Sequence, residues 1–212
     1  MENRHPSSYE IVVLTGEDLT AEQVIAVCRY NCPVQISQGS LDAMKSSRDL
    51  VEKILEEGRT VYGISTGFGN FSDKLIDAGM RDKLQENLIL SHAVGVGDPL
   101  SEEVVRGMLL LRANALCKGF SGIRPEVVET LVQMLNKRVH PVVPEKGSLG
   151  ASGDLAPLSH MSLVVLGKGE AYYKGVRMNG AEAMKAAGKT TFLEVVSYSE
   201  EECMRGAKLA VA

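Results

Sequence analysis

Apolar side chains recur at helical spacing along most of this chain, after a short extended segment near its start. The four aliphatic residues 11–14 predict a short strand. Thr20 and Gln23 have the spacing of a capping box, which predicts a helix that runs from this point towards Tyr30. The first part of the chain is therefore expected to be one strand followed by one helix.

The same pattern predicts helices through the rest of the chain. Ser40 is the expected cap of a second helix, which ends at Gly58. Five more helices are predicted over residues 84–93, 102–118, 125–140, 155–166 and 181–187. Residues 171–178 are expected to form a hairpin that turns at Lys174-Gly175. The fold class is therefore predicted to be mainly α, with a few short strands.

Helix 102–118 stands out because apolar residues surround much of its circumference, with Ser101 as its cap and Gly119 at its end. Such a helix belongs in an interior or in a subunit interface. The chain has 212 residues and a hydrophobic content of 44%, which is enough for one large core or two modest ones.

Composition excludes several classes of partner. The net charge is −4, and no basic cluster with interleaved aromatic residues is present, so nucleic acid is not an expected partner. No apolar run approaches membrane-spanning length, and the polar amino terminus lacks a signal region, so we expect a cytoplasmic protein. The four cysteines, at positions 28, 32, 117 and 203, are too sparse for a disulfide scaffold or a zinc site. We therefore expect reduced thiols and no metal.

Two segments carry candidate chemistry. Residues 61–72 are too rich in glycine for a stable strand and too irregular for a helix, and loops of this kind often carry function. In the Ala151-Ser152-Gly153 tripeptide, the amide nitrogen of Gly153 can attack the carbonyl carbon of Ala151. Loss of two waters, one of them from Ser152, would leave a five-membered electrophilic ring. On local composition alone, an ordinary loop before a helix explains this run more simply.

Four motifs change that balance, because they occur in the order found in the aromatic amino-acid ammonia-lyases. They are residues 61–69, 84–97, 119–125 and 147–161, and the chain resembles this family from about residue 10 to about residue 193. The resemblance implies the amino-terminal head of the helical ammonia-lyase fold, in the fumarase/aspartase-like superfamily, with long active-site loops. It also implies a cofactor-bearing domain at residues 1–193, a divergent tail at 194–212, and a homotetramer in the full-length family.

The resemblance also assigns roles to individual residues. Ala151-Ser152-Gly153 would become 4-methylidene-imidazol-5-one (MIO) without any external cofactor, and Tyr62 would remove the β-proton of the substrate. An unperturbed tyrosine titrates near about 10, so this role requires a stabilised phenolate. Ser91-His92 resembles the histidine-specific members, and a neutral imidazole can exchange hydrogen bonds with the ring nitrogens of histidine. The expected reaction is elimination of ammonia from L-histidine, which gives trans-urocanate.

Other interpretations stay open at this point. Tyr62 could be a half-buried aromatic residue, and His92 a core histidine bound to a backbone carbonyl. The chain could also be a tyrosine or phenylalanine ammonia-lyase or an aminomutase. After residues 191–194 the family pattern is not matched, and the later asparagine, tyrosine, arginine and glutamate of the family are not found. A non-catalytic, truncated fragment that self-associates or binds a full-length relative is therefore the alternative of a different class.

Overall fold

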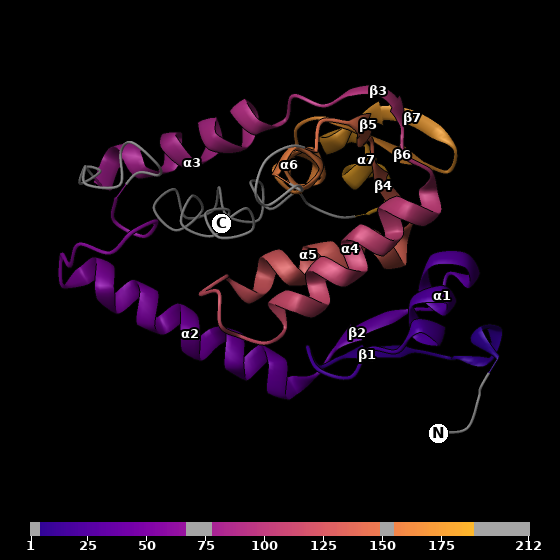
Figure 1. Ribbon diagram of the computed structural model, residues 1–212, viewed down its shortest axis with the longest axis horizontal. Helices are drawn as coiled ribbons and strands as arrows, with labels where there is room; N and C mark the ends of the chain where they lie inside the picture. Colours follow the sequence, from indigo (N-terminus) through magenta and orange to yellow (C-terminus); the bar gives the residue numbers. More distant parts are fainter. Residues whose placement is uncertain (1–4, 67–77, 149–154, 189–212) are drawn as a thin grey trace.

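The computed structural model describes residues 5–66, 78–148 and 155–188 (Figure 1). Within these ranges, seven α-helices and seven short strands follow a 3-10 turn at Pro6–Ser8. The helices are α1 Ala21–Tyr30, α2 Gln38–Glu56, α3 Ala78–His92, α4 Glu102–Leu116, α5 Pro125–Lys137, α6 Leu155–Val165 and α7 Gly180–Ala186. The strands are β1 Val12–Leu14, β2 Val34–Ile36, β3 Val96–Pro99, β4 Val139–Pro141, β5 Pro144–Lys146, β6 Glu170–Tyr173 and β7 Val176–Asn179. The prediction of a mainly α fold is confirmed.

The strands form three small sheets. β1 and β2 are parallel, β3 and β5 are antiparallel, and β4, β6 and β7 form an antiparallel sheet in that order. The hairpin predicted at residues 171–178 is β6–β7, and Lys174 and Gly175 both have positive φ, as its tight turn requires. β2, β3, β4 and β5 were not predicted, because three or four residues give too short a pattern and three of these strands contain proline.

The helix caps test the sequence reasoning most directly. The capping box of Thr20 and Gln23 is present at the start of α1, and the Ser101 side chain caps α4 as predicted. The cap predicted at Ser40 is wrong, because the Ser37 side chain accepts the hydrogen bond of the Ser40 amide and the helix begins three residues earlier. Both positions are serines at the edge of the same apolar pattern, so the pattern alone does not separate them.

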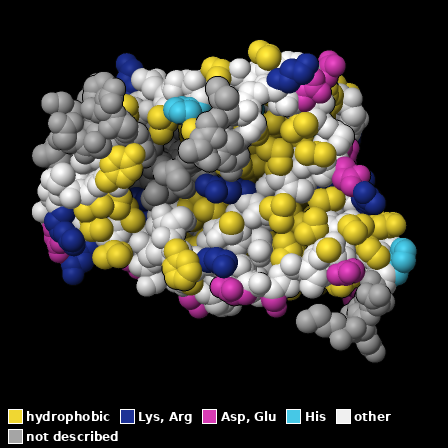
Figure 2. Space-filling model, in the orientation of Figure 1, with side chains coloured by type: hydrophobic (Ala, Val, Ile, Leu, Met, Phe, Trp, Pro, Cys, Tyr) yellow, Lys and Arg dark blue, Asp and Glu magenta, His cyan; other side chains and the backbone are white. Residues whose placement is uncertain are grey.

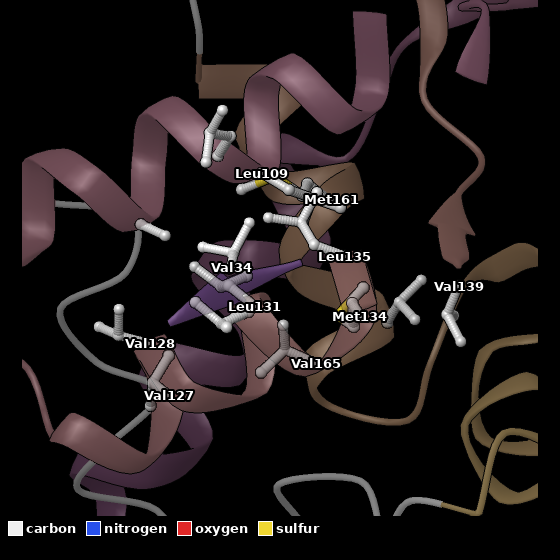
Figure 3. Close-up of a cluster of buried hydrophobic side chains, with 14 of the residues drawn as sticks. Val34, Leu109, Val127, Val128, Leu131, Met134, Leu135, Val139, Met161 and Val165 are labelled. Atoms are coloured by element: carbon white, nitrogen blue, oxygen red, sulfur yellow. The ribbon is translucent and has the colours of Figure 1, made fainter. Parts of the chain in front are cut away.

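One continuous hydrophobic core joins β2 to helices α4, α5 and α6 (Figure 3). Val34, Leu109, Leu131, Leu135 and Met161 each expose 4% or less of their surface, and they come from these four elements. The described residues therefore form the single large core that the length allowed.

Helix α4 lies in this core by one face only. Val105, Leu109 and Leu110 are buried, whereas Val104 and Leu111 expose 47% and 54% of their surface. Figure 2 shows hydrophobic side chains spread over the central part of this face of the molecule, where α4 runs in Figure 1. Of the two expected places for this helix, an interior or a subunit interface, the described residues show the interior for one side of α4, and the other side is exposed.

Candidate active site

The glycine-rich segment after α2 begins with a tight turn that carries Tyr62. The Ser65 hydroxyl accepts a hydrogen bond from the Val61 amide at 2.8 Å and donates one to the Arg59 carbonyl at 2.7 Å. Ser65 is 2% exposed, so these bonds fix the turn from the inside. Tyr62 is 61% exposed on the outside of the same turn. The predicted loop is confirmed as far as residue 66, and Tyr62 is accessible rather than half-buried.

Ser91 and His92 lie together at the carboxyl end of α3. His92 Nδ1 donates to the Leu88 carbonyl at 2.8 Å, and the Ser91 hydroxyl donates to the same oxygen at 2.9 Å. The His92 ring is half-buried, and in a neutral ring the Nδ1 hydrogen bond selects the tautomer in which Nε2 is an acceptor. His92 therefore has the backbone partner of an ordinary helix histidine on one nitrogen and an acceptor on the other.

The end of α3 is joined to the approach of the Ala151-Ser152-Gly153 tripeptide by the β3–β5 pair. β3 starts four residues after His92, and its Val96 pairs with Lys146 at the end of β5. Residues 149–154, which contain the tripeptide and Asp154, lie outside the described residues, and α6 starts directly after them. The β3–β5 pair therefore brings the stretch that follows Ser91 and His92 to the described residues just before the tripeptide.

Close backbone packing makes this junction possible. A Cβ at Gly147 would lie 2.8 Å from the Gly95 Cα, and Gly147 has φ of 150°, a conformation that other residues rarely adopt. A Cβ at Gly95 would lie 3.1 Å from His160 Nε2 and 3.2 Å from the Lys146 carbonyl oxygen. The segment that follows β5 thus passes the link between α3 and β3 at a distance that only glycine allows.

His160 fixes this junction from α6. Its Nε2 accepts a hydrogen bond from the Gly95 amide at 3.0 Å, and burial lowers the pKa of the ring, which favours the neutral acceptor form. No local pattern reveals the contact, because 65 residues separate its two partners.

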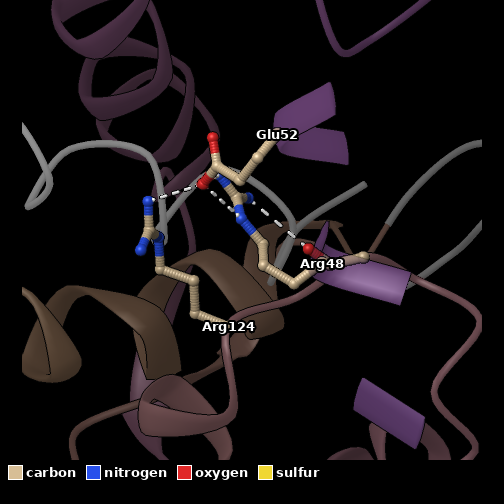
Figure 4. A network of polar contacts seen from close by, with 4 residues as sticks. Arg48, Glu52 and Arg124 are labelled. Atoms are coloured by element: carbon tan, nitrogen blue, oxygen red, sulfur yellow. Dashed lines mark hydrogen bonds and ion pairs between the residues drawn. The ribbon is translucent and has the colours of Figure 1, made fainter. Parts of the chain in front are cut away.

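The third motif, residues 119–125, is held against α2 by an arginine and glutamate cluster (Figure 4). Glu52 Oε1 accepts from Arg124 Nη2 at 2.9 Å and from Arg48 Nε at 2.8 Å. Arg48 Nη1 donates to the Gly122 carbonyl at 3.5 Å. Arg48 is 5% exposed, and the Glu52 carboxylate neutralises its charge inside the protein. Charged groups of α2 therefore fix the backbone of this motif.

His140 lies on β4 and is not part of the junction of Gly95, Gly147 and His160. Its Nε2 is 3.0 Å from Glu102 Oε1, and burial lowers its pKa to about 4. This carboxylate is the partner of His140 Nε2. Among the described residues no group of histidine, cysteine, aspartate or glutamate side chains could hold a metal ion, and Cys28, Cys32 and Cys117 are free thiols. None of the helices in those ranges is long and apolar enough to cross a membrane.

Comparison with known proteins agrees with this fold. The family model for the aromatic amino acid lyases matches residues 19–197. A histidine ammonia-lyase from Alkaliphilus metalliredigens is 59% identical over 177 residues, which cover 84% of this chain and 35% of that protein. The crystal structure of histidine ammonia-lyase from Trypanosoma cruzi matches with a TM-score of 0.77 and 35% identity, over 85% of this chain and 35% of that one. Phenylalanine aminomutase from Pantoea agglomerans matches with a TM-score of 0.82 and 30% identity, over 96% of this chain and 37% of that one.

The described part of the chain thus has the helical fold of the ammonia-lyases and aminomutases, in the fumarase/aspartase-like superfamily. The chain belongs to the aromatic amino acid lyase family, whose model covers most of its length. It spans about a third of the length of the curated relatives it matches.

Proposed function

We propose that this chain supplies the amino-terminal part of a histidine ammonia-lyase, which eliminates ammonia from L-histidine to give trans-urocanate. The observation that carries the proposal is that the stretch directly after Ser91-His92 meets both flanks of Ala151-Ser152-Gly153: β3 pairs with β5 before the tripeptide, and Gly95 bonds to His160 of α6 after it. High identity to histidine ammonia-lyases over most of this chain supports the choice of substrate. The cofactor-bearing domain is proposed to be residues 1–193, with 194–212 as a divergent tail.

The cofactor is proposed to be MIO, formed from the tripeptide itself. Nitrogen of Gly153 bonds to the carbonyl carbon of Ala151, and two waters leave, one from that carbonyl oxygen and one from the Ser152 hydroxyl. The described flanks fit a constrained backbone here, because a Cβ at Gly147 would collide with Gly95. MIO supplies the electrophile that makes the substrate amine a leaving group.

The other residues are proposed to bind the substrate and to move its proton. His92 Nε2, an acceptor in the tautomer that the Leu88 bond favours, can accept the N–H of the substrate imidazole. The Ser91 hydroxyl, bonded to the same carbonyl, keeps this end of α3 in place. Tyr62 is proposed as the base that takes the β-proton, and its exposure leaves it accessible to a substrate.

Intact mass tests the cofactor. If the tripeptide cyclises, the folded chain should be lighter than its sequence by two waters, and Ser152→Ala should lose at most one. Ser91→Ala is the matched control, because it removes a serine hydroxyl outside the tripeptide and should leave ring formation intact. A folded chain with the full sequence mass would contradict the assignment of MIO.

Substrate choice is tested by His92→Leu, in an assembly that completes the length of the relatives. The turnover of histidine, followed by urocanate absorbance, should fall at least about tenfold, because a ring nitrogen of the bound substrate is left without its partner. Leu90→Ala is the control, since Leu90 is 43% exposed on the same helix. Equal loss with histidine and phenylalanine would contradict the specificity role of His92.

The assembly is proposed to be a homotetramer, as the family resemblance implies, and the exposed apolar side of α4 supplies surface for such contacts. The alternative, a non-catalytic fragment that self-associates or binds a full-length relative, uses the same surface. Light-scattering mass measured together with urocanate production separates the two. Self-association with ring formation but without turnover would favour the fragment.

A further inference from the structure

His160 connects the two parts of the proposed site at one backbone group. It lies on α6, which follows the tripeptide, and its Nε2 accepts from the amide of Gly95, three residues after His92. Gly147 packs closely against the same Gly95, since a Cβ at Gly147 would lie 2.8 Å from the Gly95 Cα. Gly95 is therefore held between the strand that enters the tripeptide and the helix that leaves it.

We propose that His160 is a positioning residue of the lyase site, which sets the backbone geometry that ring formation requires by fastening Gly95 to α6. The inference rests on the proposed function, because ring formation is the event that the contact serves. In this proposal His160 acts through Gly95 and is given no role in binding the substrate. Ring closure depends on the approach of one backbone nitrogen to one carbonyl carbon, and small displacements of such atoms change rates strongly.

The contact needs a neutral imidazole, since a protonated Nε2 has no lone pair to accept the Gly95 amide. The charged groups that line the small cleft beside His160 are Glu170 and Arg177, and these bind each other at 3.0 Å. Glu145 and Lys146 lie on the adjacent strand β5 and also bind each other at 3.0 Å. Each pair is internally neutral, so burial decides the charge state of the ring.

The test follows ring formation by intact mass, in chains refolded from denaturant. His160→Gln keeps an acceptor at about the reach of Nε2 but does not titrate, whereas His160→Leu removes the acceptor at similar volume. We expect His160→Gln to form the ring at a rate close to wild type and His160→Leu to be slower by about tenfold or more. Met161→Val is the control for lost packing on α6. Met161 is 1% exposed, and the Gly95 amide bonds to His160 instead.

The pH profile separates positioning from stability. Below the usual pKa of histidine the wild-type rate should fall more steeply than the rate of His160→Gln, because only the wild type loses its acceptor by protonation. Equal rates in folded wild type and His160→Leu would overturn the role of His160 and leave the proposed function standing. If His160→Leu does not fold, a pH profile of His160→Gln identical to wild type overturns the role. Absence of the ring in the wild type would overturn the proposed function itself.

Discussion

Asn136, in the last turn of α5, hydrogen-bonds to both backbone groups of Val34 in β2. The Val34 amide donates to Asn136 Oδ1 at 2.8 Å, and Asn136 Nδ2 donates to the Val34 carbonyl at 2.8 Å. The side-chain amide thus satisfies the backbone groups that a neighbouring strand would bind at the open edge of the two-stranded β1–β2 sheet. An isolated pair of three-residue strands is marginal in water, so this contact helps to explain why the sheet forms.

Replacing Asn136 with alanine should lower the free energy of unfolding by about 1–3 kcal/mol, because two hydrogen bonds to a buried residue are lost. Asn114→Ala is the matched control, since Asn114 Oδ1 accepts a single bond, from the Gly16 amide at 3.1 Å. Urea unfolding measures both changes. If Asn136→Ala lowers the free energy of unfolding no more than Asn114→Ala does, the two bonds to Val34 add no stability beyond that of a single bond.

Arg106 should be a second stability determinant. It is 1% exposed, and its guanidinium donates to the Val27 carbonyl in α1 and the Leu135 carbonyl in α5, at 2.7 Å and 3.0 Å. Arg106→Met leaves both buried carbonyls without this partner, so we expect a loss on the order of 3 kcal/mol in urea unfolding. Arg29→Met, which breaks an exposed ion pair with Glu103, should change stability little. A neutral or stabilising Arg106→Met would mean that packing alone holds these helix ends.

Elements with local signals could be predicted from the sequence, and contacts between distant segments could not. The capping box at Thr20, the cap at Ser101 and the positive-φ turn at Lys174 each depend on neighbouring residues. The strands β3 and β5 form because residues about fifty positions apart meet, which no periodicity encodes.

The candidate site divides in the same way. Tyr62, Ser91, His92 and the tripeptide could be proposed from motifs, because a motif is a local pattern. The role of His160 could not, because its partner is a backbone amide on another helix–strand junction, and a backbone amide leaves no mark in the sequence. Only a three-dimensional structure reveals such a contact.

Glu52 gives a third prediction, at the 119–125 motif. Glu52→Gln removes the charge that Arg48 and Arg124 share, and Arg48 stays buried, so the free energy of unfolding should fall by about 1–3 kcal/mol. Glu57→Gln is the control on the neighbouring turn, because its pairing with Lys53 at 3.8 Å is exposed. In thermal and urea unfolding, Glu52→Gln should be less stable than Glu57→Gln. Equal effects would show that the cluster holds the motif no better than a surface ion pair does.

His140 makes stability depend on pH in a defined window. Burial lowers its pKa from 6.5 to about 4 in the folded protein, so between these values the unfolded chain binds the additional proton. Its contribution is fully present above about pH 6.5 and is lost as the pH falls towards 4, by an amount on the order of 3 kcal/mol. Arg106 and Arg138 oppose protonation, whereas Glu102 favours it, and the desolvation of the ring outweighs that carboxylate.

The measurement is urea unfolding at a series of pH values from 7 to 4. His140→Phe should flatten the slope of stability against pH in this window, whatever its effect on stability at pH 7, because the titrating group is gone. His5→Phe is the control, since His5 is exposed and should leave the slope unchanged. His160 also has a lowered pKa, so some slope should remain in His140→Phe and should fall further when His160→Gln is added. A slope in His140→Phe identical to wild type would mean that His140 is protonated in the folded state well above pH 4, with Glu102 as its ion-pair partner.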